Sequence, residues 1–309
     1  MPKPRKELIS LSETSYYHCI SRCVRRAYLC GKDRHSGQSY EHRRGWVEKR
    51  LLLLAKAFAI DVCSYAVMSN HTHVVLRVNK DEALQWSNLE VMQRWLSMHK
   101  GTVLCRAYVD SEQRQLLSDA ELITVESMIK IYRKRLFDVS WFMRLLNEFI
   151  AKKANREDNC TGRFWEGRFK SQAILDEAAL IACMAYVDLN PIRAGITSSL
   201  NTSMYTSIYL RINNSDRRKI SANLVAFKSK AAKVDELPIS FQEYLEFLTD
   251  LSSKSSNIKP IRQAQVKCKV LNKLRINQWS DAISNIEARA SAKLSLHQFI
   301  NSYGGNEPA

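Results

Sequence analysis

Two histidines separated by one residue, in the segment His71-Thr72-His73, have the right chemistry for a metal site. In a β-strand, residues i and i+2 point to the same side, so both imidazoles would project from one face and Thr72 from the other. Two imidazoles on one face can bind one divalent cation. Paired histidines near a strand end are also often simply exposed polar residues, so the pattern indicates a candidate site and leaves that alternative open.

A tyrosine and an asparagine four residues apart, Tyr186 and Asn190, lie in a segment of helical character. Residues at this spacing share a helix face, so Tyr186 is a candidate nucleophile and the amide oxygen of Asn190 a candidate metal ligand beside it. The alternative is a core tyrosine with its hydroxyl at the rim, followed by an asparagine that ends the helix before Pro191.

A third segment, residues 162–170, interleaves cations with aromatic rings. Such a segment suits a single-stranded nucleic acid, because phosphates meet the cations while bases stack on the rings. The alternative is a loop whose aromatics belong to the core. The residues in question are Arg163, Phe164, Trp165, Arg168 and Lys170.

The elements that must position these residues follow from periodicity. Alternating or β-branched stretches predict strands, apolar residues at helical spacing predict helices, and Ser69-Asn70 predicts a tight turn between two strands. A helix is expected to start at the cap Ser140, and another to run from the cap Asp176 to its end at Pro191. Together these elements predict an α+β layer with an antiparallel sheet. The expected strands are 16–22, 62–68, 73–78 and 168–175, and the expected helices cover 40–59, much of an insertion at about 80–138, 140–150 and 176–189.

The length of 309 residues indicates two domains, 1–200 and 201–309. The Ser-, Thr- and Asn-rich stretch 197–214 is typical of a linker. Beyond it, helical periodicity predicts a small, basic, mainly helical C-terminal domain with a DNA-binding or accessory role.

The formal net charge is +16, which favours a polyanionic partner, since each cation that neutralises a phosphate releases a condensed counterion. A basic surface without a specific partner is the alternative. No apolar run is long enough to span a bilayer and no secretory signal is evident, so we expect a soluble cytoplasmic protein with reduced cysteines. Cys19, Cys23 and Cys30, with His18 and His35 nearby, could be considered as a zinc site, but their irregular spacing disfavours it.

Four segments resemble, in their residues and in their order, the motifs of a known family, the single-tyrosine HUH transposases, and within it the REP-associated tyrosine transposases of bacteria. The segments are residues 17–22, 65–76, 162–169 and 186–195, so the resemblance covers roughly residues 8–200. It implies an HUH-type, ferredoxin- or RRM-like antiparallel sheet packed with helices.

The resemblance also implies roles for individual residues. His71 and His73 would hold a divalent metal, Mg²⁺ or Mn²⁺, and Tyr186 would be the nucleophile. Asn190 is the candidate third ligand, with Gln172 on the preceding strand as the alternative. The position between the histidines is usually bulky and hydrophobic in the family, but here it is Thr72, which faces away from the metal.

The implied substrate is single-stranded DNA with imperfect hairpins, the REP elements, cut and rejoined through a 5′-phosphotyrosine. Relatives act as monomers or as helix-exchanged dimers. The DNA contacts that these residue types suggest are Arg22, Arg25, Arg26, Tyr28, Arg43, Arg44, Arg163, Phe164, Trp165, Arg168, Lys170 and Arg193.

Three alternative functions stay open at this point. The same fold could bind DNA hairpins without cutting them, or serve a relaxase-like or replication-initiator-like nicking enzyme. The absence of a Walker motif from the sequence disfavours a fused helicase of the kind that accompanies such enzymes. An unrelated RNA-binding protein is the third alternative.

Overall fold

The computed structural model describes residues 8–24, 29–32, 37–213, 224–229, 235–254, 268–286 and 293–301. Within these ranges, no helix combines the length and the apolarity needed to cross a membrane.

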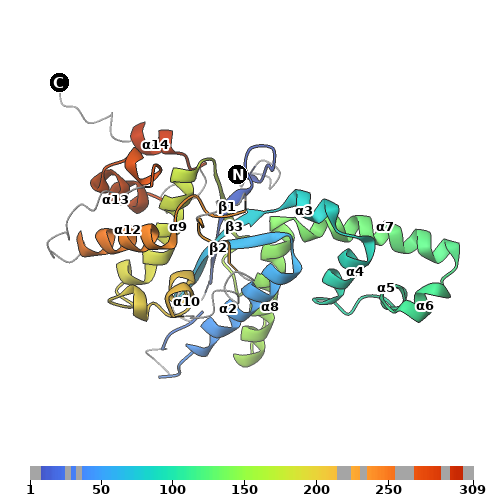
Figure 1. Ribbon diagram of the computed structural model, residues 1–309. Helices are drawn as coiled ribbons and strands as arrows, with labels where there is room; N and C mark the ends of the chain where they lie inside the picture. The colour runs from blue at the N-terminus through green and yellow to red at the C-terminus, as the bar shows by residue number, and fades with distance from the viewer. Residues whose placement is uncertain are drawn as a thin grey trace.

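A four-stranded sheet with the strand order β2-β3-β1-β4 lies at the centre of the molecule (Figure 1). All three pairs of neighbouring strands are antiparallel, with β1 and β3 in the middle. The expected α+β class with an antiparallel sheet is therefore confirmed. The strands are β1 (Tyr16–Arg22), β2 (Ile60–Val67), β3 (His71–Val78) and β4 (Lys170–Ile174).

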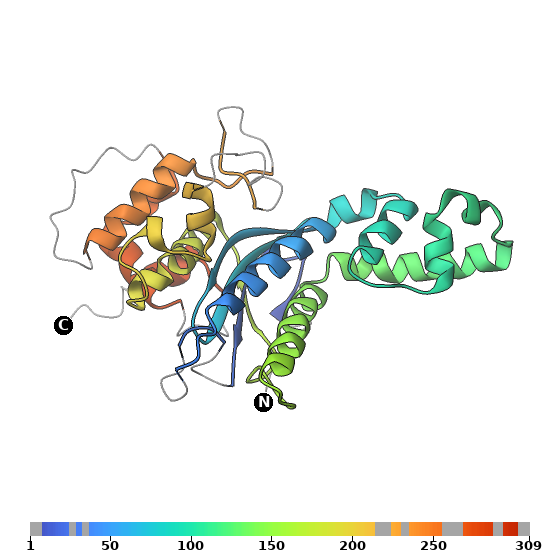
Figure 2. The ribbon, with the colours of Figure 1, turned by 90° about the horizontal axis from the view of Figure 1, so that it is seen from below.

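Helices cover both faces of this sheet (Figures 1 and 2). On one face, α2 (His42–Ala57) and α8 (Val139–Glu157) share a buried cluster with the sheet. On the other face, α9 (Glu177–Arg193) packs on β2 and β3.

Alternation along β3 decides which side chains reach which face. Val74 and Leu76 belong to the cluster under α2 and α8, whereas Val75 belongs to the cluster under α9. His71 and His73 have the same parity as Val75, so both lie on the α9 face.

The start of α8 differs from the expected one. The N-cap is Asp138 and not Ser140: the Asp138 carboxylate accepts from the backbone N–H of Ser140 at 2.6 Å and of Trp141 at 3.3 Å. Aspartate and serine are both strong N-caps, so sequence spacing alone does not separate them.

Helix α9 begins as expected and ends later than expected. Asp176 is its N-cap, accepting from the N–H of Ala179 at 2.9 Å. Pro191, the expected end, lies inside the last turn, and the helix continues to Arg193. A proline removes one N–H donor, and this far along the helix the N–H of Ala194 still closes the last turn on Asn190.

Residues 80–136 form five helices that extend away from the sheet as an arm (Figures 1 and 2). Within the arm, the rings of Trp95 and Tyr132 stack with centroids 4.4 Å apart. The helices are α3 (Lys80–Gln85), α4 (Asn88–Leu96), α5 (Val103–Val109), α6 (Ser111–Gln115) and α7 (Asp119–Leu136).

The C-terminal part is helical and packs on α9. Helices α12 (Phe241–Lys254) and α13 (Ile276–Ser284) contact α9 directly. The stretch expected to be a linker is partly helical: it contains α10 (Ser207–Asn213), whose Ile208 is fully buried. The division into two domains at residue 200 stays a prediction. The remaining elements are η1 (Leu200–Thr202), η2 (Leu271–Lys273) and α14 (Leu296–Asn301).

Candidate functional site

The two histidines stand at the start of β3, next to the central strand β1. His71 pairs with Arg22 and His73 with Ile20 across the two strands. The two imidazole rings have centroids 4.7 Å apart and lie nearly perpendicular. His71 is partly exposed and His73 is completely buried, so the pair runs from the surface into the sheet-helix interface.

The turn before β3 orients His71. The N–H of Met68 donates to the carbonyl of His71 at 2.9 Å, which closes the turn between β2 and β3. Within this turn, the side chain of Asn70 places its Oδ1 2.5 Å from Nδ1 of His71. Because an amide oxygen only accepts, this contact makes Nδ1 the protonated nitrogen of His71 and directs Nε2 away from the turn.

Helix α9 brings Tyr186 to the same place. The Tyr186 ring lies 5.3 Å from the His73 ring, centroid to centroid, at an interplanar angle of 88°. Only 3% of Tyr186 is exposed. Asn190 follows one turn later and is partly exposed. The structure thus gathers His71, His73 and Tyr186 from a strand and a helix that are more than a hundred residues apart in sequence.

His73 has the electrostatics of a metal ligand. Burial, followed by the nearby His18, His71 and Arg22, holds the pKa of His73 well below its usual range, so the ring stays neutral. Its Nε2 is buried and has no hydrogen-bond partner among the described residues. A neutral imidazole with an unused, buried nitrogen fits a divalent cation, since the cation takes the lone pair that no hydrogen bond uses.

Among the described residues, no group of three or more His, Cys, Asp or Glu side chains could hold a metal ion. A metal at His71 and His73 would therefore need a ligand of another type, such as the amide oxygen expected from Asn190. Two imidazoles and an amide oxygen would leave coordination positions for a substrate, as catalytic metal sites do. Imidazole nitrogens are softer ligands than oxygens, so of the two metals expected from the sequence this set suits Mn²⁺ better than Mg²⁺.

Sequence reasoning gave no role at this site to His18, which the structure places there. His18 lies on β1, is completely buried, and has its Nε2 3.0 Å from Nδ1 of His73. On its other side, Nδ1 of His18 is 2.6 Å from Oε1 of Gln172. The signal in the sequence was a histidine inside the strand motif 17–22, but its partners depend on strand register. Gln172, the alternative third ligand, uses its oxygen on His18.

The expected DNA-binding residues differ in where the structure places them. Arg22 and Arg193 are exposed near the histidine site, and the guanidinium of Arg193 lies 5.7 Å from the centre of the Tyr186 ring. Arg163, Arg168 and Lys170 are exposed along the segment that leads into β4. Arg25, Arg26 and Tyr28 lie outside the described residues.

Three expected contacts are buried instead. Phe164 is 2% exposed and packs in the core, so its ring offers no surface for base stacking, whereas the neighbouring Trp165 is half-buried. Arg43 is completely buried and pairs with Glu157 and Asp158. Arg44 is also buried and donates to the carbonyl of Val67. Arg43 and Arg44 therefore make contacts inside the protein and do not form part of an exposed DNA-binding surface.

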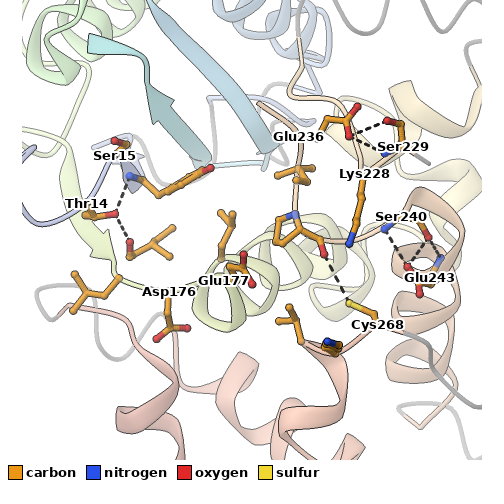
Figure 3. Close-up of a pocket in the computed structure, with 18 residues that line it drawn as sticks. Thr14, Ser15, Asp176, Glu177, Lys228, Ser229, Glu236, Ser240, Glu243 and Cys268 are labelled. Atoms are coloured by element: carbon orange, nitrogen blue, oxygen red, sulfur yellow. Dashed lines mark hydrogen bonds between the residues drawn. The ribbon is translucent and has the colours of Figure 1, made fainter. Parts of the chain in front are cut away.

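A cavity of about 930 Å³ lies at the other end of the sheet, between the start of β1, the end of β4 and the C-terminal segments (Figure 3). Three of its four carboxylates are engaged: Asp176 caps α9, Glu236 accepts from Ser229, and Glu243 accepts from Ser240. His71, His73 and Tyr186 are not among its lining residues. The cavity is therefore separate from the histidine site.

Comparisons with known proteins give one distant likeness. No family model matches the sequence, and no curated protein matches it. Among solved structures, the chain is similar to a REP-associated tyrosine transposase bound to a REP hairpin, with 10% sequence identity and a TM-score of 0.40. The match covers 75% of this chain and 98% of that chain. Values this low mark a distant structural relation and carry no conclusion about function.

Proposed function

We propose that this chain is a metal-dependent nuclease and strand transferase for single-stranded DNA, with Tyr186 as its nucleophile. The observation that carries the proposal is the gathering of His71, His73 and Tyr186, with the buried, unpartnered Nε2 of His73 beside the tyrosine ring. The motif resemblance to the REP-associated tyrosine transposases supports the same roles.

In the proposed reaction, the phenol oxygen of Tyr186 attacks the scissile phosphorus and forms a new P–O bond. The P–O3′ bond breaks, and the proton that the phenol loses is balanced by the one that the departing 3′-oxygen gains. The downstream strand stays on Tyr186 as a 5′-phosphotyrosine. Attack by a 3′-hydroxyl reverses the step, so rejoining needs no external energy source.

His71 and His73 are the proposed protein ligands of the divalent metal. When bound, the metal supplies positive charge that polarises the scissile phosphate. For the third ligand we favour Asn190 over Gln172. The Gln172 oxygen accepts from His18 and its amide nitrogen donates to the Ile286 carbonyl. Asn190 shares the helix face of Tyr186, and its side chain makes no hydrogen bond to the described residues.

The proposed substrate is a single strand that carries imperfect hairpins of the REP type. Exposed cations near the site, Arg22 and Arg193, would contact its phosphates, and the segment Arg163 to Lys170 would extend this surface along β4. The net charge of +16 agrees with a polyanionic partner.

Covalent trapping tests the proposal. Hairpin oligonucleotides labelled at the 3′ end are incubated with the protein and Mn²⁺ and resolved on a denaturing gel. The 3′-labelled fragment is expected to migrate with the protein, because the downstream strand carries the phosphotyrosine. Tyr186→Phe should lower this product at least about a thousandfold while DNA binding stays. Tyr209→Phe on α10 is the matched control and should cleave normally. A cleaving Tyr186→Phe variant would refute the role of Tyr186.

One observation favours a second candidate, a hairpin-binding protein that does not cut. Tyr186 is 3% exposed, and a nucleophile must reach the phosphorus, so cleavage requires DNA binding to uncover the ring. Tight hairpin binding with no covalent product in Mn²⁺ or Mg²⁺ would establish this candidate instead.

A further inference from the structure

His18 and Gln172 occupy a defined place in the sheet beside His73. His18 pairs directly with Gln172 across β1 and β4, and His73 pairs with Ile20, two residues along β1. The three side chains therefore share one face of the sheet, with His18 diagonal to His73. His18 and His73 are completely buried and Gln172 is 1% exposed.

In the hydrogen bonds between these side chains, a contact with the C-terminal segment determines which atom donates and which accepts. Nε2 of Gln172 donates to the carbonyl of Ile286 at 3.1 Å, just after α13. A carbonyl only accepts, so this bond fixes the amide with its oxygen toward His18. Nδ1 of His18, 2.6 Å from that oxygen, must then carry the proton.

The position of the proton on His18 in turn determines the position of the proton on His73. With its proton on Nδ1, a neutral His18 offers the lone pair of Nε2, and Nδ1 of His73 lies 3.0 Å away to donate to it. His73 then carries its proton on Nδ1 and a free lone pair on Nε2. The reverse direction would place an N–H at Nε2 of His73, where no acceptor among the described residues meets it.

We propose that His18 and Gln172 are positioning residues that, together with the Ile286 carbonyl, hold His73 in the tautomer whose Nε2 can ligate the metal. The proposal rests on the metal site of the proposed function and adds a role for the C-terminal segment, which orients a ligand about two hundred residues earlier in the chain. Outer partners of this kind orient metal-binding histidines and influence metal affinity.

The tautomer can be read without any variant. In the metal-free, full-length protein with ¹⁵N-labelled histidine, long-range ¹H–¹⁵N spectra distinguish a protonated Nδ1 from a protonated Nε2 in each ring. We expect protonated Nδ1 in both His18 and His73. A protonated Nε2 in His73 overturns the proposal.

Metal affinity gives the second measurement. His18→Phe keeps a ring of similar size and removes the acceptor, and it should weaken Mn²⁺ binding, measured by calorimetry, by about 10- to 100-fold. His18→Gln places a carbonyl oxygen near the former Nε2 position and should retain affinity within about threefold, a rescue that a purely space-filling role does not predict. Equal Mn²⁺ affinity in wild type and His18→Phe overturns the positioning role of His18.

The two proposals fail in different ways. In wild-type protein, Mn²⁺ should broaden the ring signals of His71 and His73 because the ion is paramagnetic. If it does not, the metal site of the proposed function is overturned, whatever the tautomers are. If it does, and His18→Phe binds Mn²⁺ as tightly as wild type, only the positioning role is overturned.

Discussion

Asp188 is a buried carboxyl two residues after Tyr186, and it ties α9 to the C-terminal helices. It accepts hydrogen bonds from the hydroxyls of Ser207 at 2.5 Å and Tyr244 at 2.7 Å, and from the N–H of Ile208 at 3.2 Å. Burial raises its pKa from 3.8 to about 6, even though these donors and Arg211 lower it. The carboxyl is therefore a structural group whose charge state depends on pH.

The raised pKa predicts how stability changes with pH. The folded state binds a proton more tightly than the unfolded state, so this contribution is fully present below pH 3.8 and is lost as pH rises through about 6. The shift corresponds to about 3 kcal/mol. Asp188→Asn removes the titration, so the variant should gain up to about 3 kcal/mol on wild type between pH 4 and pH 7. Urea unfolding at several pH values measures this difference.

A second variant tests the cause of the shift from the opposite direction. Tyr244→Phe removes a donor that lowers the pKa of Asp188, so the loss of stability should extend to higher pH than in wild type. Parallel pH profiles for wild type and Asp188→Asn would show that Asp188 does not control this dependence.

At the scale of elements, the start of α8 gives a matched pair of variants. Asp138 caps the helix by accepting two backbone N–H groups, whereas Ser140 contributes only its own N–H to that cap. Asp138→Ala should lower the free energy of unfolding by about 1 kcal/mol, and Ser140→Ala should change it by less than about 0.5 kcal/mol. Chemical denaturation measures both. A larger loss in Ser140→Ala would contradict the assigned cap.

Several strands and helices, α8 among them, could be predicted from the sequence. Strand alternation and helical spacing are local properties, so β1, β3, α8 and α9 could be recognised, and the parity of His71 and His73 followed from β3 alone. The exact caps were less predictable, because two capping residues stood two positions apart.

The partners of His18 could not be predicted in the same way. They depend on the registers that place Ile20 opposite His73 and Gln172 opposite His18, and these involve three strands separated by up to about 150 residues. The burial of Phe164 and Arg43 is likewise a property of packing between distant elements, which a local mixture of cations and aromatics does not reveal. The face on which a side chain lies was therefore easier to predict than the contacts that it makes with distant elements.

At the scale of the whole molecule, the positive charge is distributed over parts with different expected roles. Arg163, Arg168 and Lys170 are exposed in and beside β4, in the sheet that carries the histidines. The arm of α3 to α7 also carries exposed lysines, but it extends away from the sheet (Figure 2). If the DNA follows the segment that leads into β4, only the first group should contribute counterion release.

Salt dependence distinguishes the two groups. The logarithm of the binding constant for a single-stranded hairpin oligonucleotide is measured against the logarithm of salt concentration. Replacing Arg163, Arg168 and Lys170 with alanine should reduce the magnitude of the slope by about 2, since each phosphate contact on a single strand contributes about 0.7. The control replaces the exposed Lys100, Lys130 and Lys134 of the arm with alanine. It removes the same charge, so an unchanged slope in the control excludes an effect of net charge alone. A reduced slope in the control and not in the first variant would place the DNA on the arm instead.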